Sequence, residues 1–98
     1  MELYAVREQR GGPWDWNRPL REQAGFDLHT QFMDDLVAAG FVVLGGPLDG
    51  DREVLLVLNA PAEPAIRETL AADPWVRNGM LTVTSIERWT ILLEGRRQ

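Results

Sequence analysis

The hydrophobic residues of this chain follow two spacings, and segments with one spacing alternate with segments that have the other. Short stretches whose apolar residues alternate, or that are apolar throughout, predict β-strands; longer stretches with apolar residues three or four positions apart predict helices. The predicted strands are residues 2–8, 41–44, 53–58 and 81–93, and the predicted helices are residues 27–39 and 62–72. The order is therefore strand, helix, strand, strand, helix, strand.

Residues with particular backbone preferences mark where these elements begin and end. Asp27 is typical of a helix N-cap, and Gly40 is typical of the residue that follows a helix. The segment Gly45-Gly46-Pro47 is expected to end the second strand. Pro74 ends the second helix, because the residue before a proline is pushed out of the helical region. In the last strand the apolar positions change phase, which predicts a β-bulge near Ser85.

The order of elements is that of the ferredoxin-like α+β fold, in which two helices cover one face of a four-stranded antiparallel sheet. The strand at 53–58 is apolar on both faces, and the strand at 41–44 is apolar throughout. A sheet with one face in water should alternate, so we expect a second copy of the chain to cover the face without helices, giving a homodimer through sheet faces. The alternative is that so short a strand only looks apolar on both faces.

The segment 10–26 has no periodicity and is long for a connection inside a compact domain. It carries Trp14 and Trp16, whose apolar area is too large to leave in water, so we expect this loop to fold back on the body of the protein. Residues 1–98 are expected to form one domain, with residues 94–98 as a flexible tail.

The composition excludes several classes of chemistry. The chain has no cysteine, and its ten basic residues are all arginines, which leaves no thiolate nucleophile, disulfide or lysine Schiff base. A formal net charge of −5 argues against nucleic acid as a partner. The sequence shows no signal peptide and no apolar run long enough to span a membrane, so we expect a cytoplasmic protein without a membrane partner.

His29 is the only histidine and stands just inside the first helix, in line with Met33. Its ring is expected at the edge of the apolar stripe, partly in a cleft. A helix N-terminus disfavours the charged imidazolium, so a neutral ring that can accept a proton, as in a general base, is expected. The alternative is a surface histidine bonded to a loop carbonyl.

Asp73 has two interpretations. Its charge opposes the dipole at the end of the second helix, which a catalytic role could explain. Asp73-Pro74 also has the pattern of an N-cap followed by proline at the first helical position, and this capping role is the safer interpretation from spacing alone. Both can hold, since a carboxylate has two oxygens.

Other residues could line a pocket. Two adjacent glycines at 45–46 allow close approach of a ligand, and Pro47 makes the chain rigid where it leaves them, although a simple turn is the safer interpretation of the pattern. The candidate aromatic lining consists of Trp14, Trp16 and Trp75, whose alternative role is packing. Four arginines could hold a carboxylate, and nothing in the spacing chooses among them: Arg7, Arg18, Arg21 and Arg77. No cluster has the spacing of metal ligands.

The motifs considered together resemble those of a known family. They are His29, Leu36 to Gly40, Gly46-Pro47, Ala72-Asp73-Pro74-Trp75 followed by Gly79, and Ile86-Glu87-Arg88-Trp89. In this combination the chain resembles the YCII-related (YciI-like) family, over roughly residues 25–92 and more loosely in the first strand.

The resemblance implies a dimeric α+β barrel with an active site built from His29 and Asp73, and no cofactor. Some relatives remove HCl from chlorinated hydroxyquinone-type aromatics. One departure concerns the Arg-Pro step that relatives often carry shortly before the histidine. Here Arg18-Pro19 lies well upstream in the long loop, which puts the substrate in doubt.

Three functions remain open. The first is a cofactor-independent enzyme of lyase, isomerase or dehydrochlorinase type, acting on a small cyclic or aromatic compound, with Asp73 orienting the His29 base. Gly46, Pro47, Trp75, Met33, Trp14 and Trp16 would then contact the substrate. The second is a non-catalytic module that binds a small molecule or takes part in an assembly. The third treats the pocket as packing.

Overall fold

The structure is a computed structural model that describes residues 2–95. Its strands are β1 (Leu3–Arg10), β2 (Val42–Pro47), β3 (Glu53–Asn59) and β4 (Leu81–Arg88). Its helices are η1 (Leu20–Glu22), α1 (Phe26–Ala38), α2 (Glu63–Leu70) and α3 (Pro74–Arg77). Of the predicted tail at 94–98, residues 96–98 lie outside the described residues.

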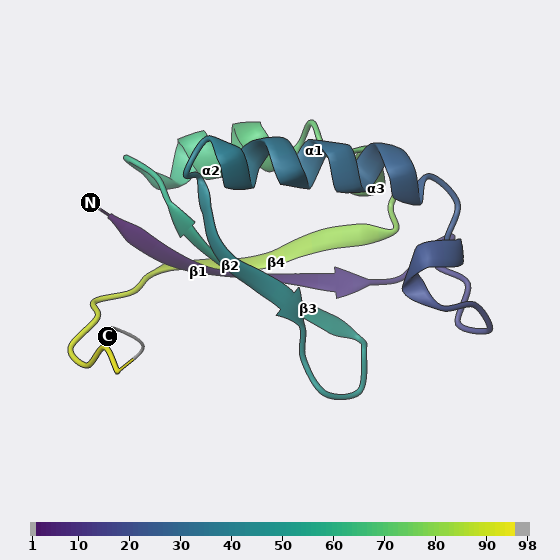
Figure 1. The fold of residues 1–98 in the computed structure, drawn as a ribbon, viewed down its shortest axis with the longest axis horizontal. Helices are drawn as coiled ribbons and strands as arrows, with labels where there is room; N and C mark the ends of the chain where they lie inside the picture. The colour runs from purple at the N-terminus through teal and green to yellow at the C-terminus, as the bar shows by residue number, and fades with distance from the viewer. Residues whose placement is uncertain (1, 96–98) are drawn as a thin grey trace.

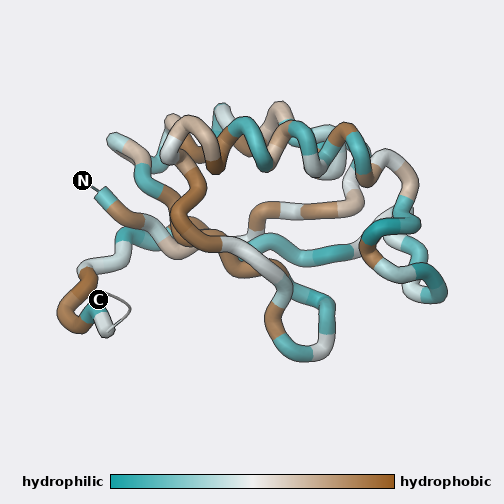
Figure 2. Tube along the Cα trace, in the orientation of Figure 1, coloured by the Kyte–Doolittle hydropathy of each residue, from teal (hydrophilic) through white to brown (hydrophobic). Residues whose placement is uncertain are grey.

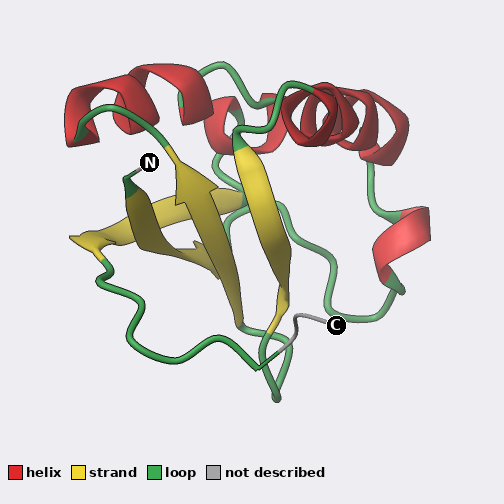
Figure 3. Ribbon diagram, turned by 60° about the vertical axis from the view of Figure 1, so that its left-hand side comes forward, coloured by secondary structure: helices red, strands yellow, loops and turns green. Residues whose placement is uncertain are grey.

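The four strands form one antiparallel sheet in the order β2-β3-β1-β4. Helices α1, α2 and α3 lie together on one face of this sheet, as Figures 1 and 3 show from two directions, and the short helix η1 lies beyond the end of the sheet. This arrangement confirms the predicted ferredoxin-like α+β fold. The neighbouring strands β2 and β3 pair antiparallel, as a hairpin.

The first strand alternates buried and more exposed side chains along its whole length. Tyr4, Val6, Glu8 and Arg10 are all buried. Since side chains two apart share a face of a strand, these four lie on the same face of β1. Tyr4 and Val6 belong to a core cluster. Glu8 and Arg10 follow them on the same face of β1, so two charged side chains lie in line with two core residues.

A β-bulge interrupts the pairing of β1 with β4, as the sequence predicted. Arg7 pairs with Ser85 and Glu8 pairs with Val83, which leaves Thr84 without a partner in the ladder. The Thr84 hydroxyl donates to the Arg7 carbonyl at 3.2 Å.

The last strand ends at Arg88, so the predicted extent of 81–93 is wrong. The reason is the length of its partner. Arg88 pairs with Tyr4, and one further hydrogen bond joins Trp89 N to the Leu3 carbonyl at 2.8 Å. Trp89 therefore lies beyond the strand and is 46% exposed.

The first helix begins one residue before Asp27, so the prediction of Asp27 as its N-cap is wrong. The N-cap is Gly25, which has φ +78°, and Asp27 lies in the first turn. Glycine adopts this left-handed conformation without steric cost. A Cβ atom at Gly25 would also lie 3.3 Å from Trp75 Nε1. At the other end Gly40 has φ +80°, which confirms its predicted place after the helix.

The second strand continues through Gly45, Gly46 and Pro47, so the prediction that these residues end it is wrong. Gly45 pairs with Leu56, and the turn comes later, at residues 48–52. A Cβ atom at Gly45 would lie 2.7 Å from Leu56 Cδ2. The glycine therefore lets the strand keep its pairing where the Leu56 side chain approaches the backbone.

The core between the helices and the sheet has two clusters of buried side chains. The larger contains Val6, Leu58, Ile66 and Leu70, so Ile66 and Leu70 of α2 face inward. The smaller contains Trp14, Trp75, Met80 and Leu81. The first helix has no buried residue of its own.

The face of the sheet without helices is also apolar. Val43 and Leu44 are 40% and 47% exposed, and Val57 is buried. The segment after β4 runs along this side, away from the helices (Figure 1), and it is strongly hydrophobic at residues 91–93 (Figure 2). Leu92 and Leu93 are 86% and 92% exposed.

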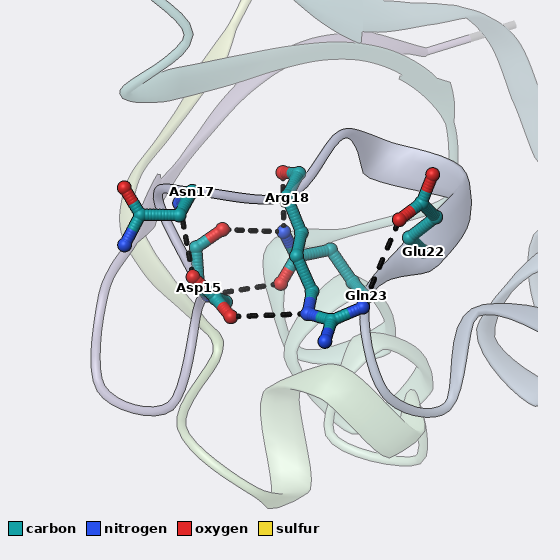
Figure 4. A network of polar contacts seen from close by, with 5 residues as sticks. All are labelled: Asp15, Asn17, Arg18, Glu22 and Gln23. Carbon is teal, nitrogen blue, oxygen red and sulfur yellow. Dashed lines mark hydrogen bonds and ion pairs between the residues drawn. The ribbon is translucent and has the colours of Figure 1, made fainter.

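The long loop between β1 and α1 folds back on itself and on the core. The amide of buried Gln23 donates to the carbonyls of Asp15 and Arg18, at 2.7 and 2.8 Å, and its oxygen accepts from Asp15 N. Arg18 forms ion pairs with Asp15 and Glu22, and Asn17 N donates to Asp15 Oδ1 (Figure 4). This network gives the loop a defined shape.

Candidate active site

The fold brings His29 and Asp73 into direct contact although 44 positions separate them in sequence. His29 Nδ1 lies 2.8 Å from Asp73 Oδ1. Asp73 is fully buried, whereas the His29 side chain is 15% exposed. A carboxylate at Nδ1 holds the ring in one orientation and leaves Nε2 as the nitrogen available to a ligand.

The Asp73 carboxylate also caps α3, so the two roles considered for it coexist. Asp73 Oδ1 accepts from Trp75 N at 2.9 Å, in addition to its contact with His29. An ionised carboxylate can only accept hydrogen bonds, so against an ionised Asp73 the donor is His29 Nδ1. Asp73 Oδ2 is buried without a hydrogen-bond partner among the described residues. Both roles therefore use one oxygen.

Trp75 supports the histidine from one side. The two rings are stacked, with their centroids 4.0 Å apart and their planes 8° from parallel. Trp75 is 1% exposed, and its Nε1 donates to the Ala24 carbonyl at 2.8 Å. An aromatic face in contact with an imidazole also stabilises the imidazolium that forms when the ring takes a proton.

The His29 ring lines a pocket of about 420 Å³ between α1 and the sheet. Met33 and Val37 continue the lining along α1, at successive intervals of four residues. The remaining lining residues are Glu8, Arg10, Leu20, Val42, Val43, Leu44, Gly45, Gly46, Pro47, Val54, Leu56, Trp75 and Leu81. A volume of this size accommodates a small organic ligand.

The pocket includes four of the six residues predicted to contact a substrate, namely Met33, Gly46, Pro47 and Trp75. Trp14 and Trp16 are not among its lining residues. Trp14 packs edge-on against Trp75 at 5.4 Å, and Trp16 is 50% exposed. The long loop contributes Leu20 to the lining instead.

Glu8 is a pocket residue that the sequence analysis did not identify. It is 2% exposed, and its Oε2 has no hydrogen-bond partner within residues 2–95. Burial, and secondly the negative charge of Asp73, raise the pKa of Glu8 from 4.5 to about 7. The alternation of Tyr4 and Val6 pointed to it, because the same face of the strand includes residue 8.

Arg10 is the second residue that was missed, and among residues 2–95 it is the only arginine in the pocket lining. None of the four arginines considered from sequence lines it. The Arg10 side chain is 5% exposed and is held by Asp51, whose carbonyl and carboxylate lie 2.9 and 3.2 Å from Nη1. Its guanidinium also lies 4.2 Å from the centre of the Trp14 ring.

A metal-binding cluster and a membrane-spanning helix are both absent from the part of the chain that the structure describes. In residues 2–95, no group of three or more His, Cys, Asp or Glu side chains is arranged to hold a metal ion. None of the helices there has the length and hydropathy that a membrane crossing needs.

Comparison with known proteins shows the fold. No protein family and no curated protein matches the sequence. A similar solved structure is 5-chloro-2-hydroxyhydroquinone dehydrochlorinase (TftG) from Burkholderia phenoliruptrix AC1100, in complex with 2,5-dihydroxybenzoquinone. The TM-score is 0.65 and the identity 21%, over 90% of this chain and 93% of the other. The likeness supports the α+β architecture described above.

Proposed function

We propose that this chain is a YciI-like enzyme that performs cofactor-independent acid–base chemistry on a small cyclic or aromatic compound. The observation that carries the proposal is the 2.8 Å contact between His29 and Asp73 at the wall of a mostly apolar pocket. The similar dehydrochlorinase, which was solved with a quinone ligand, supports a ring-shaped substrate.

In the proposed reaction His29 Nε2 takes a proton from the substrate. Asp73 orients the ring and stabilises the imidazolium that forms, because its buried carboxylate faces Nδ1. Trp75 covers one face of the ring and excludes water from that side. Isomerisation, or elimination of HX, fits this arrangement. A positioned general base contributes about 10²–10⁴-fold to the rate of such a step.

The test is chloride release from 5-chloro-2-hydroxyhydroquinone, followed by turnover of a panel of hydroxylated and chlorinated benzenes and cyclic ketones. His29→Gln should lower turnover by at least about 10²-fold, and Asp73→Asn should lower it in the same direction. Asp34→Asn, on the exposed side of α1, is the matched control and should keep wild-type turnover. Circular dichroism shows whether each variant is folded.

Two results would contradict the proposal. Undiminished turnover by a folded His29→Gln variant would remove the histidine from the mechanism. Binding of panel compounds without turnover by the wild-type protein would favour a non-catalytic small-molecule-binding module, in which the same residues determine affinity alone.

We also propose that the protein is a homodimer joined through the faces of its sheets that carry no helices. Val43, Leu44 and the segment at 91–93 supply the apolar surface there. An apolar face of this kind is more stable when it is covered than when it is in water. Light scattering after size-exclusion chromatography should give twice the mass of the 11.1 kDa chain; the mass of a single chain would contradict the proposal.

A further inference from the structure

The pocket contains two polar side chains that the proposed reaction does not use, Glu8 and Arg10. They lie two positions apart on β1, and both are turned to the helix-bearing face. Each keeps one buried atom, Glu8 Oε2 and Arg10 Nε, without a hydrogen-bond partner in the described part of the chain. A buried polar atom without a partner is costly, and a ligand that supplies the partner removes the cost.

The Glu8 carboxyl is able to donate a proton near neutral pH. Its pKa of about 7 means that the acid form is well populated there. Asp73, before α3, is close enough for its charge to raise the pKa of Glu8, and the other charged or titratable residues that line the same pocket are His29 on α1 and Arg10 on β1. Its ladder partners on β3 and β4 are the apolar Val54 and Val83.

Arg10 is held in place by groups other than Glu8. The Asp51 carbonyl accepts a hydrogen bond from Nη1, the Asp51 carboxylate forms an ion pair with the same atom, and Trp14 lies against the guanidinium. Asp51 itself has φ 60°, a left-handed conformation that aspartate tolerates better than most residues. A guanidinium fixed in this way can present its free Nε–H to an oxygen with little loss of side-chain entropy.

We propose that Glu8 is the proton donor that acts together with the His29 base, that Arg10 binds the oxygen receiving the proton, and that the ligand is therefore an enolisable carbonyl compound. The proposed role of Glu8 rests on the proposed function, because a proton donor at Glu8 needs His29 as the base. A base and an acid in one pocket suit keto–enol conversion, in which one proton leaves carbon and another joins oxygen.

The step balances without an oxidant or a reductant. His29 Nε2 takes a proton from the carbon beside the carbonyl, and the electrons of that C–H bond form a C=C bond. The electron pair of the C=O π bond moves to oxygen, which takes the proton of Glu8. The product is an isomer of the substrate. His29 is left protonated and Glu8 ionised, and exchange with water restores both.

The test measures binding of 2,5-dihydroxybenzoquinone by calorimetry from about pH 5 to about pH 9. If the ligand binds only when Glu8 is protonated, the wild-type dissociation constant rises by about tenfold per pH unit above about 7. Glu8→Gln, which keeps a donor but cannot ionise, should lose this rise. Histidine also changes charge in this range, so Glu8→Gln is compared in the His29→Gln background as well.

Two further variants sharpen the test. Arg10→Gln should weaken binding by about tenfold or more at every pH, because a hydrogen bond from a charged group is lost. Glu68→Gln, on the exposed side of α2, is the control and should match the wild-type protein throughout.

Three results would overturn the proposal. The first is that the wild-type protein does not bind 2,5-dihydroxybenzoquinone. The second is that its affinity does not weaken above about pH 7, and the third is that the affinity of Glu8→Gln weakens as much as that of wild type. Turnover separates this proposal from the one above. Loss of activity in His29→Gln, together with an unchanged pH profile in Glu8→Gln, contradicts only the role of Glu8. Activity that survives in His29→Gln contradicts the proposed function.

Discussion

Replacing Glu8 by glutamine should change how the stability of the protein depends on pH. In the unfolded chain the Glu8 carboxyl ionises around its ordinary pKa of 4.5, whereas burial and the charge of Asp73 raise the pKa of Glu8 to about 7 in the folded protein. Below about 4.5 the carboxyl is protonated in both states. Between the two values the unfolded chain releases the proton and the folded protein keeps it, so the stability of wild type falls as pH rises.

The size of the effect follows from the interval between the two pKa values. From 4.5 to about 7 is about 2.5 pH units, and one unit corresponds to about 1.4 kcal/mol, so the loss is about 3 kcal/mol. Glutamine does not ionise, so the free energy of unfolding of Glu8→Gln does not fall in this way as pH rises. The free energy of unfolding of Glu8→Gln minus that of wild type should therefore increase by about 3 kcal/mol between about pH 4.5 and about pH 8, and then stay constant.

Urea denaturation followed by tryptophan fluorescence, at a series of pH values, measures this difference. Glu68→Gln is the control, because its side chain is exposed and the exchange should have little effect at any pH. A difference between Glu8→Gln and wild type that does not change with pH would refute the reasoning, since it would mean that Glu8 ionises equally easily in the folded and unfolded states.

Other predictions concern the neighbours of Glu8, the packing of the histidine and the second sheet face. Asp73→Asn should lower the pKa of Glu8 part of the way toward 4.5, since burial remains as the larger cause; carbon NMR of the carboxyl measures it, and an unchanged value would contradict the coupling. Trp75→Phe should destabilise the fold by about 0.5–1.5 kcal/mol in urea, because the hydrogen bond to the Ala24 carbonyl is lost; a cost near zero would contradict this. Leu44→Glu should halve the mass measured by light scattering if the apolar sheet face joins two copies. An unchanged mass would place any interface elsewhere.

The local patterns of the sequence predicted the framework of the fold and part of the site. The helical spacing that puts His29 in line with Met33 correctly placed both at the pocket. The change of phase in the last strand correctly located the bulge beside Ser85. Both features depend on periodicity within one element, which is visible in the sequence.

Features set by contacts between distant segments could not be predicted in this way. The extent of β2 depends on its pairing with β3, and the end of β4 depends on where β1 begins. The N-cap of α1 is Gly25, where a side chain would approach the Trp75 ring, which comes 50 positions later in the chain. Likewise, the spacing of residues along the sequence could not show that a single oxygen of Asp73 contacts His29 and also caps α3.

Glu8 and Arg10 form an intermediate case. The alternation that begins with Tyr4 and Val6 includes both residues, so the sequence could predict that they lie on the core-facing side of β1. Charged residues near the end of a strand are expected to reach solvent, however, and contacts with distant segments, such as Trp14 and Asp51 against Arg10, could not be seen in the sequence.

The tautomer of the His29 ring tests the central claim most directly. His29 is the only histidine, so nitrogen NMR of protein labelled in histidine gives one pair of ring signals. At a pH where the ring is neutral, the account predicts a proton on Nδ1, donated to Asp73, and a free lone pair on Nε2. In Asp73→Asn the preference for Nδ1–H should be lost. A proton on Nε2 in the wild-type protein, or a tautomer that Asp73→Asn leaves unchanged, would contradict a His29 base oriented by Asp73.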